Sequence, residues 1–433
     1  MELLEQILSK ENLNEAYKRV VANKGASGVD GVKVEDLYFY IQEHRAEILE
    51  AIRTRKYKPQ PVRRVEIPKD NGKMRQLGIP TVIDRVIQQA IAQRLIPIYE
   101  KQFSDSSYGF RPGRSCEHAV IRSLELLNLY KLEWIVDIDL ERFFDTVHHD
   151  RLMNLLSRTI DDGDVLSLIR KFLVSGVMIG TTFEETPIGT PQGGNLSPLL
   201  SNIMLNELDK ELEKRGLQFV RYADDCNILV GSRKAAERVM RTVSDFIERK
   251  LGLKVNVTKS KIGKPHEIKF LGFGYFKDKE GIYQAKPHEQ SILKLKRKLK
   301  ALTSRNWSIS LDNRLRKLKL QIVGWVSYFR IGKMKSILSK IDEHLRRRIR
   351  IVIWKQWKTI HKRYESLRKL GINHETAYMT ANSRKSYQCV STSYALHRGI
   401  TNERLSRRGL ISLLAQYEKV HVALATINRT AVY

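Results

Sequence analysis

The chain has 433 residues, of which 77 are Lys or Arg and 48 are Asp or Glu, so its net charge is +29. Hydrophobic residues make up 42%, which predicts a globular protein, and the length allows more than one core. The excess of positive charge indicates a polyanionic partner. Because no apolar run approaches the length of a bilayer span, we expect nucleic acid and no membrane.

The three cysteines, Cys116, Cys226 and Cys389, have no paired spacing. They therefore indicate neither a disulfide framework nor a zinc ribbon, and they favour a reducing, cytoplasmic location. The acidic, amphipathic N-terminus does not have the pattern of a signal peptide.

The positive charge is concentrated in the last third of the chain. Residues 287–433 hold 32 Lys and Arg against 8 Asp and Glu, a net of +24, which leaves +5 for all that precedes them. A catalytic body of nearly balanced charge joined to a basic arm suits an enzyme that holds a long polyphosphate chain.

The first part of the chain alternates helical and extended patterns. Apolar residues from 3 to 22 recur at helical spacing, and the glycine-rich stretch 23–32 predicts a mobile loop. Residues 57–80 predict two strands around an Asp-Asn-Gly turn, with several cations along them. Residues 81–99 predict an amphipathic helix, and the turn-forming segment 106–114 follows.

An acidic segment spans residues 134–145. Its apolar start predicts a strand, and because alternate strand residues point to one face, Asp137 and Asp139 lie on the same side. Either of them, or both, could face a site.

Residues 219–230 predict a β-hairpin whose tip reads Tyr-Ala-Asp-Asp. Asp224 and Asp225 repel each other there, and a divalent cation relieves such repulsion. For these four residues alone, a solvent-exposed turn is the alternative. With the strand at 134–145, however, three carboxylates around two metal ions fit in-line phosphoryl transfer, and Mg²⁺ suits such a site.

Together these segments resemble reverse transcriptases, and among them those encoded by bacterial group II introns. Residues 222–225 are similar to their catalytic hairpin, 139–145 to their other metal-ligand strand, and 189–198, Gly-Thr-Pro-Gln-Gly-Gly-Asn-Leu-Ser-Pro, to their nucleotide and template segment. Further similarities at 111–112, at 269–273 and near the N-terminus extend over nearly the whole chain. The resemblance implies an α+β right-hand polymerase fold, with fingers and an antiparallel palm sheet, an α-helical thumb and a small basic C-terminal domain.

The same resemblance implies the parts of the catalytic site. Asp139, Asp224 and Asp225 are the implied catalytic metal ligands, with Leu140 completing the set around two Mg²⁺ ions, for which Mn²⁺ is a substitute. The nucleotide contacts are then Lys69, Arg75, Phe144 and Gln192. Arg63, Arg64 and Lys73 are equally basic alternatives to the two cations. Phe144 is expected to exclude ribonucleotides by its bulk, and Phe143 is the alternative gate.

The template and primer contacts that the resemblance implies are Lys24, Gly25, Gly28, Arg111, Gly193, Lys259 and Gly272. Three parts of this set have a plain structural alternative. The N-terminal loop can be a helix-to-helix connector, the segment around Arg111 a structural turn, and Lys259 a surface lysine.

Beyond residue 287, apolar residues at alternating spacings of three and four predict three packed amphipathic helices. Such a bundle resembles the thumb of these enzymes, which also acts as the maturase domain. Its dense basic segment, Arg346, Arg347, Arg348 and Arg350, is expected to bind RNA.

The expected domains are residues 1–285 (fingers, palm and N-terminal extension), 286–370 (thumb and maturase domain) and 371–433 (DNA-binding domain). Because Cys389 stands alone, we expect no endonuclease domain, as in the compact group IIC type.

The predicted function is that of an RNA-directed DNA polymerase and intron maturase that also acts in intron mobility by target-primed reverse transcription. The expected partners are group II intron RNA, an RNA template with a DNA or RNA primer, target DNA and dNTPs. One alternative is a standalone reverse transcriptase of the diversity-generating, defence or CRISPR-associated kind. A maturase with a decayed polymerase site is another, against which the three intact carboxylates argue.

Overall fold

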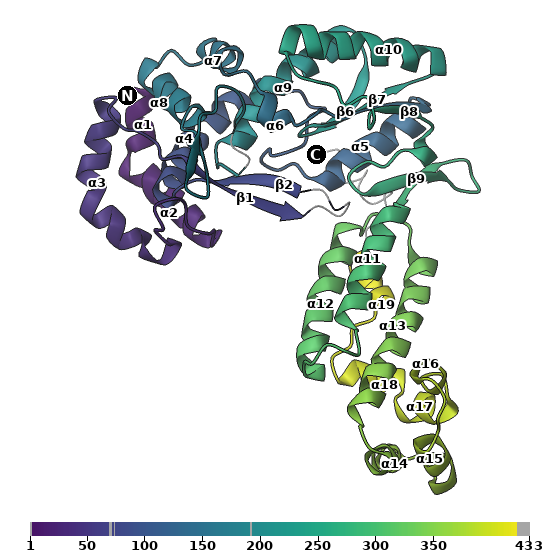
Figure 1. The fold of residues 1–433 in the computed structure, drawn as a ribbon. Helices are drawn as coiled ribbons and strands as arrows, with labels where there is room; N and C mark the ends of the chain where they lie inside the picture. The colour runs from purple at the N-terminus through teal and green to yellow at the C-terminus, as the bar shows by residue number, and fades with distance from the viewer. Residues whose placement is uncertain (1, 69–71, 73, 191–192, 422–433) are drawn as a thin grey trace. The chain divides into compact units, whose positions relative to one another are not determined.

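The computed structural model describes residues 2–68, 72, 74–190 and 193–421 (Figure 1). The chain divides into two compact units between Lys264 and Pro265. The strands β9 (Phe273–Lys277) and β10 (Tyr283–Pro287) thus belong to the second unit, although the predicted first domain extends to residue 285. The division into three functional domains stays a prediction.

A four-stranded antiparallel sheet forms the centre of the first unit. Its order is β6 (Gln218–Tyr222), β7 (Asp225–Val230), β3 (Trp134–Ile138) and β8 (Lys261–Gly263). One face of the sheet is apolar and joins the main core together with helix α9 (Ser197–Lys214). The predicted strand and hairpin are confirmed, and their other face is left for polar side chains.

A second sheet in the first unit contains the other predicted hairpin. Strands β1 (Val62–Pro68) and β2 (Met74–Ile79) pair antiparallel, and β4 (Val177–Ile179) with β5 (Thr182–Glu184) extends the sheet from β1. Most of the predicted Asp-Asn-Gly turn lies outside the described residues.

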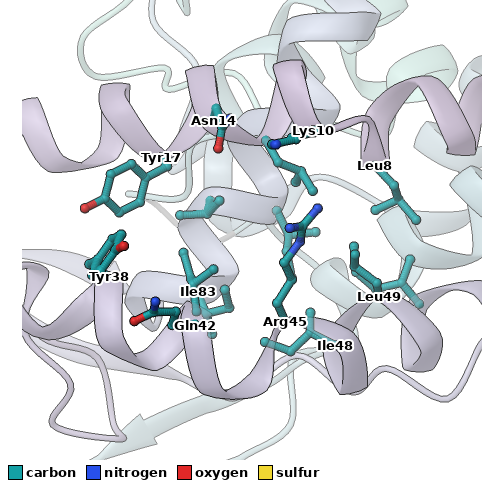
Figure 2. A pocket seen from close by; sticks show the side chains of 15 residues that line it. Leu8, Lys10, Asn14, Tyr17, Tyr38, Gln42, Arg45, Ile48, Leu49 and Ile83 are labelled. Atoms are coloured by element: carbon teal, nitrogen blue, oxygen red, sulfur yellow. The ribbon is translucent and has the colours of Figure 1, made fainter.

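The N-terminal helices are α1 (Leu3–Leu8), α2 (Lys10–Ala22), α3 (Leu37–Arg53) and α4 (Val82–Glu100). The helical pattern from 3 to 22 is interrupted at Ser9, which leaves helical geometry and whose side chain accepts a hydrogen bond from the Asn12 N–H. A pocket of about 330 Å³ lies among α2, α3 and α4, and Figure 2 shows its mainly apolar lining. None of its lining residues is acidic, so it cannot supply a carboxylate metal site.

The other helices of the first unit surround these sheets. They are α5 (Cys116–Asn128), α6 (Phe143–Thr146), α7 (His149–Ser157), α8 (Gly163–Leu173) and α10 (Arg233–Phe246).

Helices dominate the second unit (Figure 1). They are α11 (Glu289–Leu302), α12 (Leu311–Tyr328), α13 (Lys335–Gln356), α14 (Ile360–Lys369), α15 (His374–Ala381), α16 (Tyr387–Val390), α17 (Tyr394–Gly399), α18 (Asn402–Arg407) and α19 (Leu413–Val420). The three predicted amphipathic helices are confirmed as α11, α12 and α13. Their periodic apolar residues are buried, among them Leu295, Leu318, Ile322, Leu345 and Ile349.

The last helix, α19, returns to pack against α12 and α13. The Tyr417 hydroxyl donates to the Gly332 carbonyl at 3.1 Å, and the carboxylate of Asp342 accepts the Leu413 N–H at 2.8 Å. The stretch beyond residue 371 is therefore partly built into the bundle. Within the described residues, no helix combines the length and apolar content that a bilayer crossing requires.

Candidate active site

The register between β3 and β7 brings the acidic residues together. Asp137 lies opposite Asn227 and Ile138 opposite Cys226, so the next step places Asp139 opposite Asp225. Because Ile138 and Cys226 point into the core, Asp137, Asp139 and Asp225 share the opposite face. The sequence predicted two separate acidic clusters, and the sheet combines them into one.

The tip of the β6–β7 hairpin is a two-residue loop. Tyr222 pairs with Asp225, which leaves Ala223 and Asp224 as the loop residues. Ala223 has a left-handed φ of 56°, as the favoured hairpin turns require at this position. Asp224 is thereby held beside Asp225 at the end of the strand.

The carboxylates at this edge carry more negative charge than their surroundings neutralise. Partial burial, followed by the charges of Asp224, Asp137 and Asp139, raises the pKa of Asp225 to about 7, although its side chain is still exposed on one side. Burial likewise raises the pKa of Asp137 to about 6. A bound cation would relieve this repulsion.

Asp137 and Asp139 differ in what they contact. The carboxylate of Asp137 accepts a hydrogen bond from Asn227 Nδ2 at 2.9 Å, within the sheet. The carboxylate of Asp139 faces Lys259, whose Nζ lies 3.1 and 3.2 Å from its two oxygens. Since Asp139 lies opposite Asp225, the geometry favours Asp139 as the metal ligand and brings Lys259 to the same place.

Backbone contacts fix the direction of the Leu140 carbonyl. The Glu141 N–H donates to Lys254 O and the Asn256 N–H to Asp139 O, each at 2.8 Å. These two bonds flank Leu140 and Val255, which therefore form a non-hydrogen-bonded pair. The Leu140 carbonyl points away from Val255, toward the β7 side of the strand, as the predicted metal contact requires.

The donor set fits a hard divalent cation. Carboxylate and carbonyl oxygens are the ligands that Mg²⁺ prefers, and such sites are commonly completed by substrate phosphates and water. Within the described ranges, no three His, Cys, Asp or Glu side chains converge closely enough to hold a metal by themselves. A metal ion held by Asp139, Asp224 and Asp225 would therefore need further oxygen ligands from water or substrate.

A pocket of about 300 Å³ in the first unit contains the predicted sugar gate. Phe144 lines it together with Asp145, Thr190, and Gln76 and Gly78 of β2. Phe143 is buried in the core, 2% exposed, and its ring packs edge-on against Phe144. The structure therefore favours Phe144 over Phe143 as the gate.

Two arginines bring positive charge to this pocket. Arg64 and Arg142 line it. Arg75 is not among the residues that line it, although its neighbours Gln76, Leu77 and Gly78 on β2 are. Arg64 is one of the predicted alternatives, and Arg142 lies within the segment 139–145, where the sequence did not single it out as a contact. Lys69 and Gln192 lie outside the described residues.

The N-terminal loop is held against the first unit. A Cβ at Gly25 would lie 2.2 Å from Arg85 Nη1, and one at Gly28 would lie 2.6 Å from the Thr81 Cα. Arg85 also donates to the carbonyl of Ala26. Gly25 and Gly28 thus allow close packing of this loop, and its predicted mobility stays a prediction. Lys24, which is exposed with a φ of 46°, precedes them.

Arg111 and Gly193 also have structural contacts. The Arg111 side chain is 2% exposed, pairs with Glu100 and donates to the carbonyls of Ser104 and Ser107. This favours the turn interpretation of Arg111 over a template contact. Gly193, with a φ of 123°, lies where a Cβ would meet the Gly78 carbonyl at 2.4 Å.

The remaining predicted residues belong to the second unit. Gly272, with a φ of 82°, precedes β9, and its carbonyl accepts hydrogen bonds from the Ser291 hydroxyl and the His288 N–H. Arg350 is buried and donates to Ile400 O and Asn402 Oδ1.

The other three arginines of the predicted basic segment differ in what they contact. Arg348 donates to Thr303 at the end of α11. Arg346 and Arg347 line an open pocket of about 470 Å³, together with Lys340, His344 and His397.

Comparison with known proteins gives the same result as the geometry. Residues 67–275 match the family model described as reverse transcriptase (RNA-dependent DNA polymerase), and residues 292–371 match the maturase-specific domain of group II introns. Protein YkfC of Escherichia coli (strain K12) is 36% identical over 304 residues, which cover 61% of this chain and 79% of that protein.

Two further alignments cover a smaller share of the compared protein. The group II intron-encoded protein LtrA of Lactococcus lactis subsp. cremoris is 41% identical over 207 residues, 48% of this chain and 34% of that protein. The solved partial Cas6-RT-Cas1--Cas2 complex aligns with a TM-score of 0.37 and 24% identity, over 57% of this chain and 43% of that chain. At that score the structural similarity carries no argument.

The fold and the acidic site define a reverse transcriptase, an RNA-directed DNA polymerase. More particularly, the chain belongs to the family of reverse transcriptases that group II introns encode. The predicted α+β polymerase fold and enzyme class are confirmed. Membership implies dependence on a divalent metal ion, and the maturase-specific domain implies an RNA partner.

Proposed function

We propose that this chain copies RNA into DNA at the edge of strands β3 and β7, and that it acts on a group II intron both in splicing and in mobility. The observation that carries the proposal is that Asp139 lies opposite Asp225 on one polar face, with Asp224 in the turn directly before Asp225. Two Mg²⁺ ions, replaceable by Mn²⁺, would supply activation of the primer hydroxyl and stabilisation of the phosphate charge.

The protein side chains then have separate tasks. Asp139, Asp224 and Asp225 hold the metal-binding edge, and Leu140 adds a carbonyl. Lys259, which contacts Asp139, neutralises charge beside the leaving pyrophosphate. Phe144 limits the space at the sugar, while Arg64 and Arg142 provide positive charge in the adjoining pocket. Lys69, Arg75 and Gln192 remain proposed nucleotide contacts by resemblance.

The nucleic-acid partners follow from family membership and charge. The maturase-specific domain at residues 292–371 supports an intron-encoded enzyme over a standalone reverse transcriptase. We assign group II intron RNA to the basic second unit, with Arg346 and Arg347 as contacts. An RNA template with its primer, target DNA and dNTPs are the substrates of target-primed synthesis. Lys24, Gly25, Gly28, Gly193 and Gly272 stay proposed template and primer contacts, and a bacterial cytoplasm is the proposed location.

The decisive variant for the polymerase is Asp225→Ala. Removing one carboxylate from the metal edge should reduce primer extension by about 10³-fold or more, while RNA affinity stays within about twofold. Asp245→Ala, an exposed aspartate on α10, is the matched control and should leave synthesis unchanged. Substantial residual synthesis by Asp225→Ala would contradict the two-metal assignment.

The intron assignment has a separate test. The protein is crosslinked in its native host and purified, and the RNA bound to it is sequenced. Enrichment of one structured intron that contains this reading frame is expected. Recovery of unrelated RNAs, or of one dedicated non-intron RNA, would contradict the maturase function and leave the polymerase chemistry standing.

A further inference from the structure

The turn that presents the two adjacent aspartates needs support from outside the hairpin. Its first loop residue, Ala223, has a φ of 56°, in a region that residues with a Cβ rarely adopt. The next loop residue is Asp224, and Asp225 follows at the start of β7. Any relaxation of Ala223 therefore turns both carboxylates away from Asp139.

A buried arginine from the preceding strand holds this turn. The Nη1 of Arg221 donates to the Ala223 carbonyl at 2.9 Å and to Asn202 Oδ1 at 3.1 Å. Its Nε donates to Asp209 Oδ1 at 2.7 Å, and its Nη2 donates to the other oxygen of Asp209. The guanidinium thus connects helix α9 to the turn with hydrogen bonds in several directions.

A second contact supports the turn from the segment before α5. Asn202 Nδ2 donates to the Gly109 carbonyl at 2.8 Å. Gly109 lies so close to the turn that a Cβ there would be 2.2 Å from the Ala223 nitrogen. Asn202 therefore links both supports, because it contacts Arg221 with its oxygen and Gly109 with its nitrogen.

The ion pair in this cluster contributes geometry more than charge. Arg221 and Asp209 are both 0% exposed and carry opposite charges, so together they add no net charge beside the aspartates. A bidentate pair of this kind fixes the plane of the guanidinium. The fixed plane, in turn, directs Nη1 at the Ala223 carbonyl.

We propose that Arg221, fixed by Asp209 and Asn202, is a positioning residue that sets the left-handed turn at Ala223 and so aligns Asp224 and Asp225 for metal binding. This inference rests on the proposed role of Asp224 and Asp225 as metal ligands. A cluster with a merely structural role would affect the stability of the fold and leave the affinity for metal unchanged.

The first test is Arg221→Lys, which keeps the positive charge and removes the planar fork. Mn²⁺ binding is followed by the electron paramagnetic resonance signal of the free ion. The sample is the full chain with RNA template, a 3′-deoxy-terminated primer and dNTP. We expect the apparent Mn²⁺ dissociation constant to rise about tenfold, kcat to fall by a similar factor, and the KM for dNTP at saturating metal to stay within about twofold. Arg19→Lys, in an exposed ion pair with Glu15, is the control and should change none of these.

A second pair of variants separates positioning from stability. Asn202→Ala removes the bonds to Arg221 and Gly109 and leaves the ion pair in place. Asn206→Ala, one turn further along α9, also removes two hydrogen bonds, but those join Asn206 to the Gln102 carbonyl and the Ser104 N–H. Both variants should melt at similarly lowered temperatures, and only Asn202→Ala should weaken Mn²⁺ binding.

The results distinguish this inference from the proposed function. Unchanged Mn²⁺ affinity in folded Asn202→Ala, or equal weakening in Asn202→Ala and Asn206→Ala, would overturn the positioning role. If Asp225→Ala is inactive while Arg221→Lys behaves like the parent, the positioning role fails and the catalytic assignment stands. If Asp225→Ala retains synthesis, the catalytic assignment itself fails.

Discussion

The edge of strands β3 and β7 and the middle of helix α13 both concentrate charge of one sign, but they hold it differently. At the strand edge, the backbone register forces Asp139 and Asp225 opposite each other, and the turn adds Asp224. Repulsion there cannot relax by moving the chain, and together with burial, which is the larger cause, it raises the pKa of Asp225 to about 7. Fixed like charges of this kind indicate a site for a counterion.

On helix α13 the charges are divided between two tasks. Arg350 and Arg348 use their guanidinium groups on acceptors within the second unit, such as Ile400 O and Thr303 Oγ1. Arg346 and Arg347 line an open pocket with Lys340, and Arg350 also borders that pocket but is itself buried. A dense run of charge therefore does not identify a binding site by itself, because tertiary acceptors decide which members face a ligand.

The strongest test of the strand-edge geometry compares Asp139→Asn with Asp137→Asn. The two residues share a face two positions apart, but only Asp139 lies opposite Asp225. We expect Asp139→Asn to reduce single-turnover extension by about 10³-fold, and Asp137→Asn by less than about tenfold. Equal losses would mean that both carboxylates bind metal, and a larger loss in Asp137→Asn would reverse the assignment.

The two adjacent phenylalanines offer a similar contrast between site and core. Phe144→Ala should raise ribonucleotide incorporation relative to dNTP about tenfold or more, because it enlarges the pocket at the sugar. Phe143→Ala should leave discrimination unchanged and lower the free energy of unfolding by about 3–5 kcal/mol, because its ring is in the core. Nucleotide incorporation assays on both variants measure the discrimination, and denaturant melts measure the free energy of unfolding. Loss of discrimination in Phe143→Ala alone would identify Phe143 as the gate.

Sequence reasoning succeeded where local geometry determines the outcome. Strand alternation and the tight hairpin turn were enough to predict that Asp139, Asp224 and Asp225 lie at strand ends. The apolar spacing in α12 and α13 likewise predicted the buried residues Leu318 and Leu345.

The failures arise where distant parts of the chain supply the partner. Arg111 resembles a surface cation in the sequence, yet Glu100 and the carbonyl of Ser107 satisfy it in the interior. The glycines near residue 25 predict mobility, but the same composition also permits close packing against Arg85. Neither Arg221 nor Asp209 carried any motif signal, because their pairing depends on how α9 lies against β6.

The division among the α13 arginines can be tested with one pair of variants. Arg350→Gln should lower the free energy of unfolding by about 2 kcal/mol, since it leaves buried acceptors unpaired. Its affinity for RNA, measured on folded protein, should stay within about twofold. Arg346→Gln combined with Arg347→Gln should reverse this pattern. RNA affinity is expected to fall about tenfold, with a salt slope smaller by about two and an unchanged melting temperature. Equal RNA affinity in both proteins would contradict the division.

The smallest effect expected is a pH dependence of RNA binding through His344. Burial, and then the charges of Arg347, Arg348 and Lys296, lower the pKa of His344 below 6.5, so the ring is neutral at pH 7. The pocket it lines also holds Lys340, Arg346, Arg350 and His397, with Glu343 as its acidic member. Phosphate groups in this pocket would favour the protonated ring, so binding takes up a proton and affinity rises as pH falls from 7 toward 5.5.

We expect RNA affinity to rise roughly two- to threefold over this pH range. The rise should be smaller in His344→Gln and unchanged in His361→Gln, an exposed histidine on α14. Fluorescence anisotropy with a labelled RNA measures it. An equal gain in the parent, His344→Gln and His361→Gln would mean that another group takes up the proton. His344 would then not belong to the RNA-binding surface.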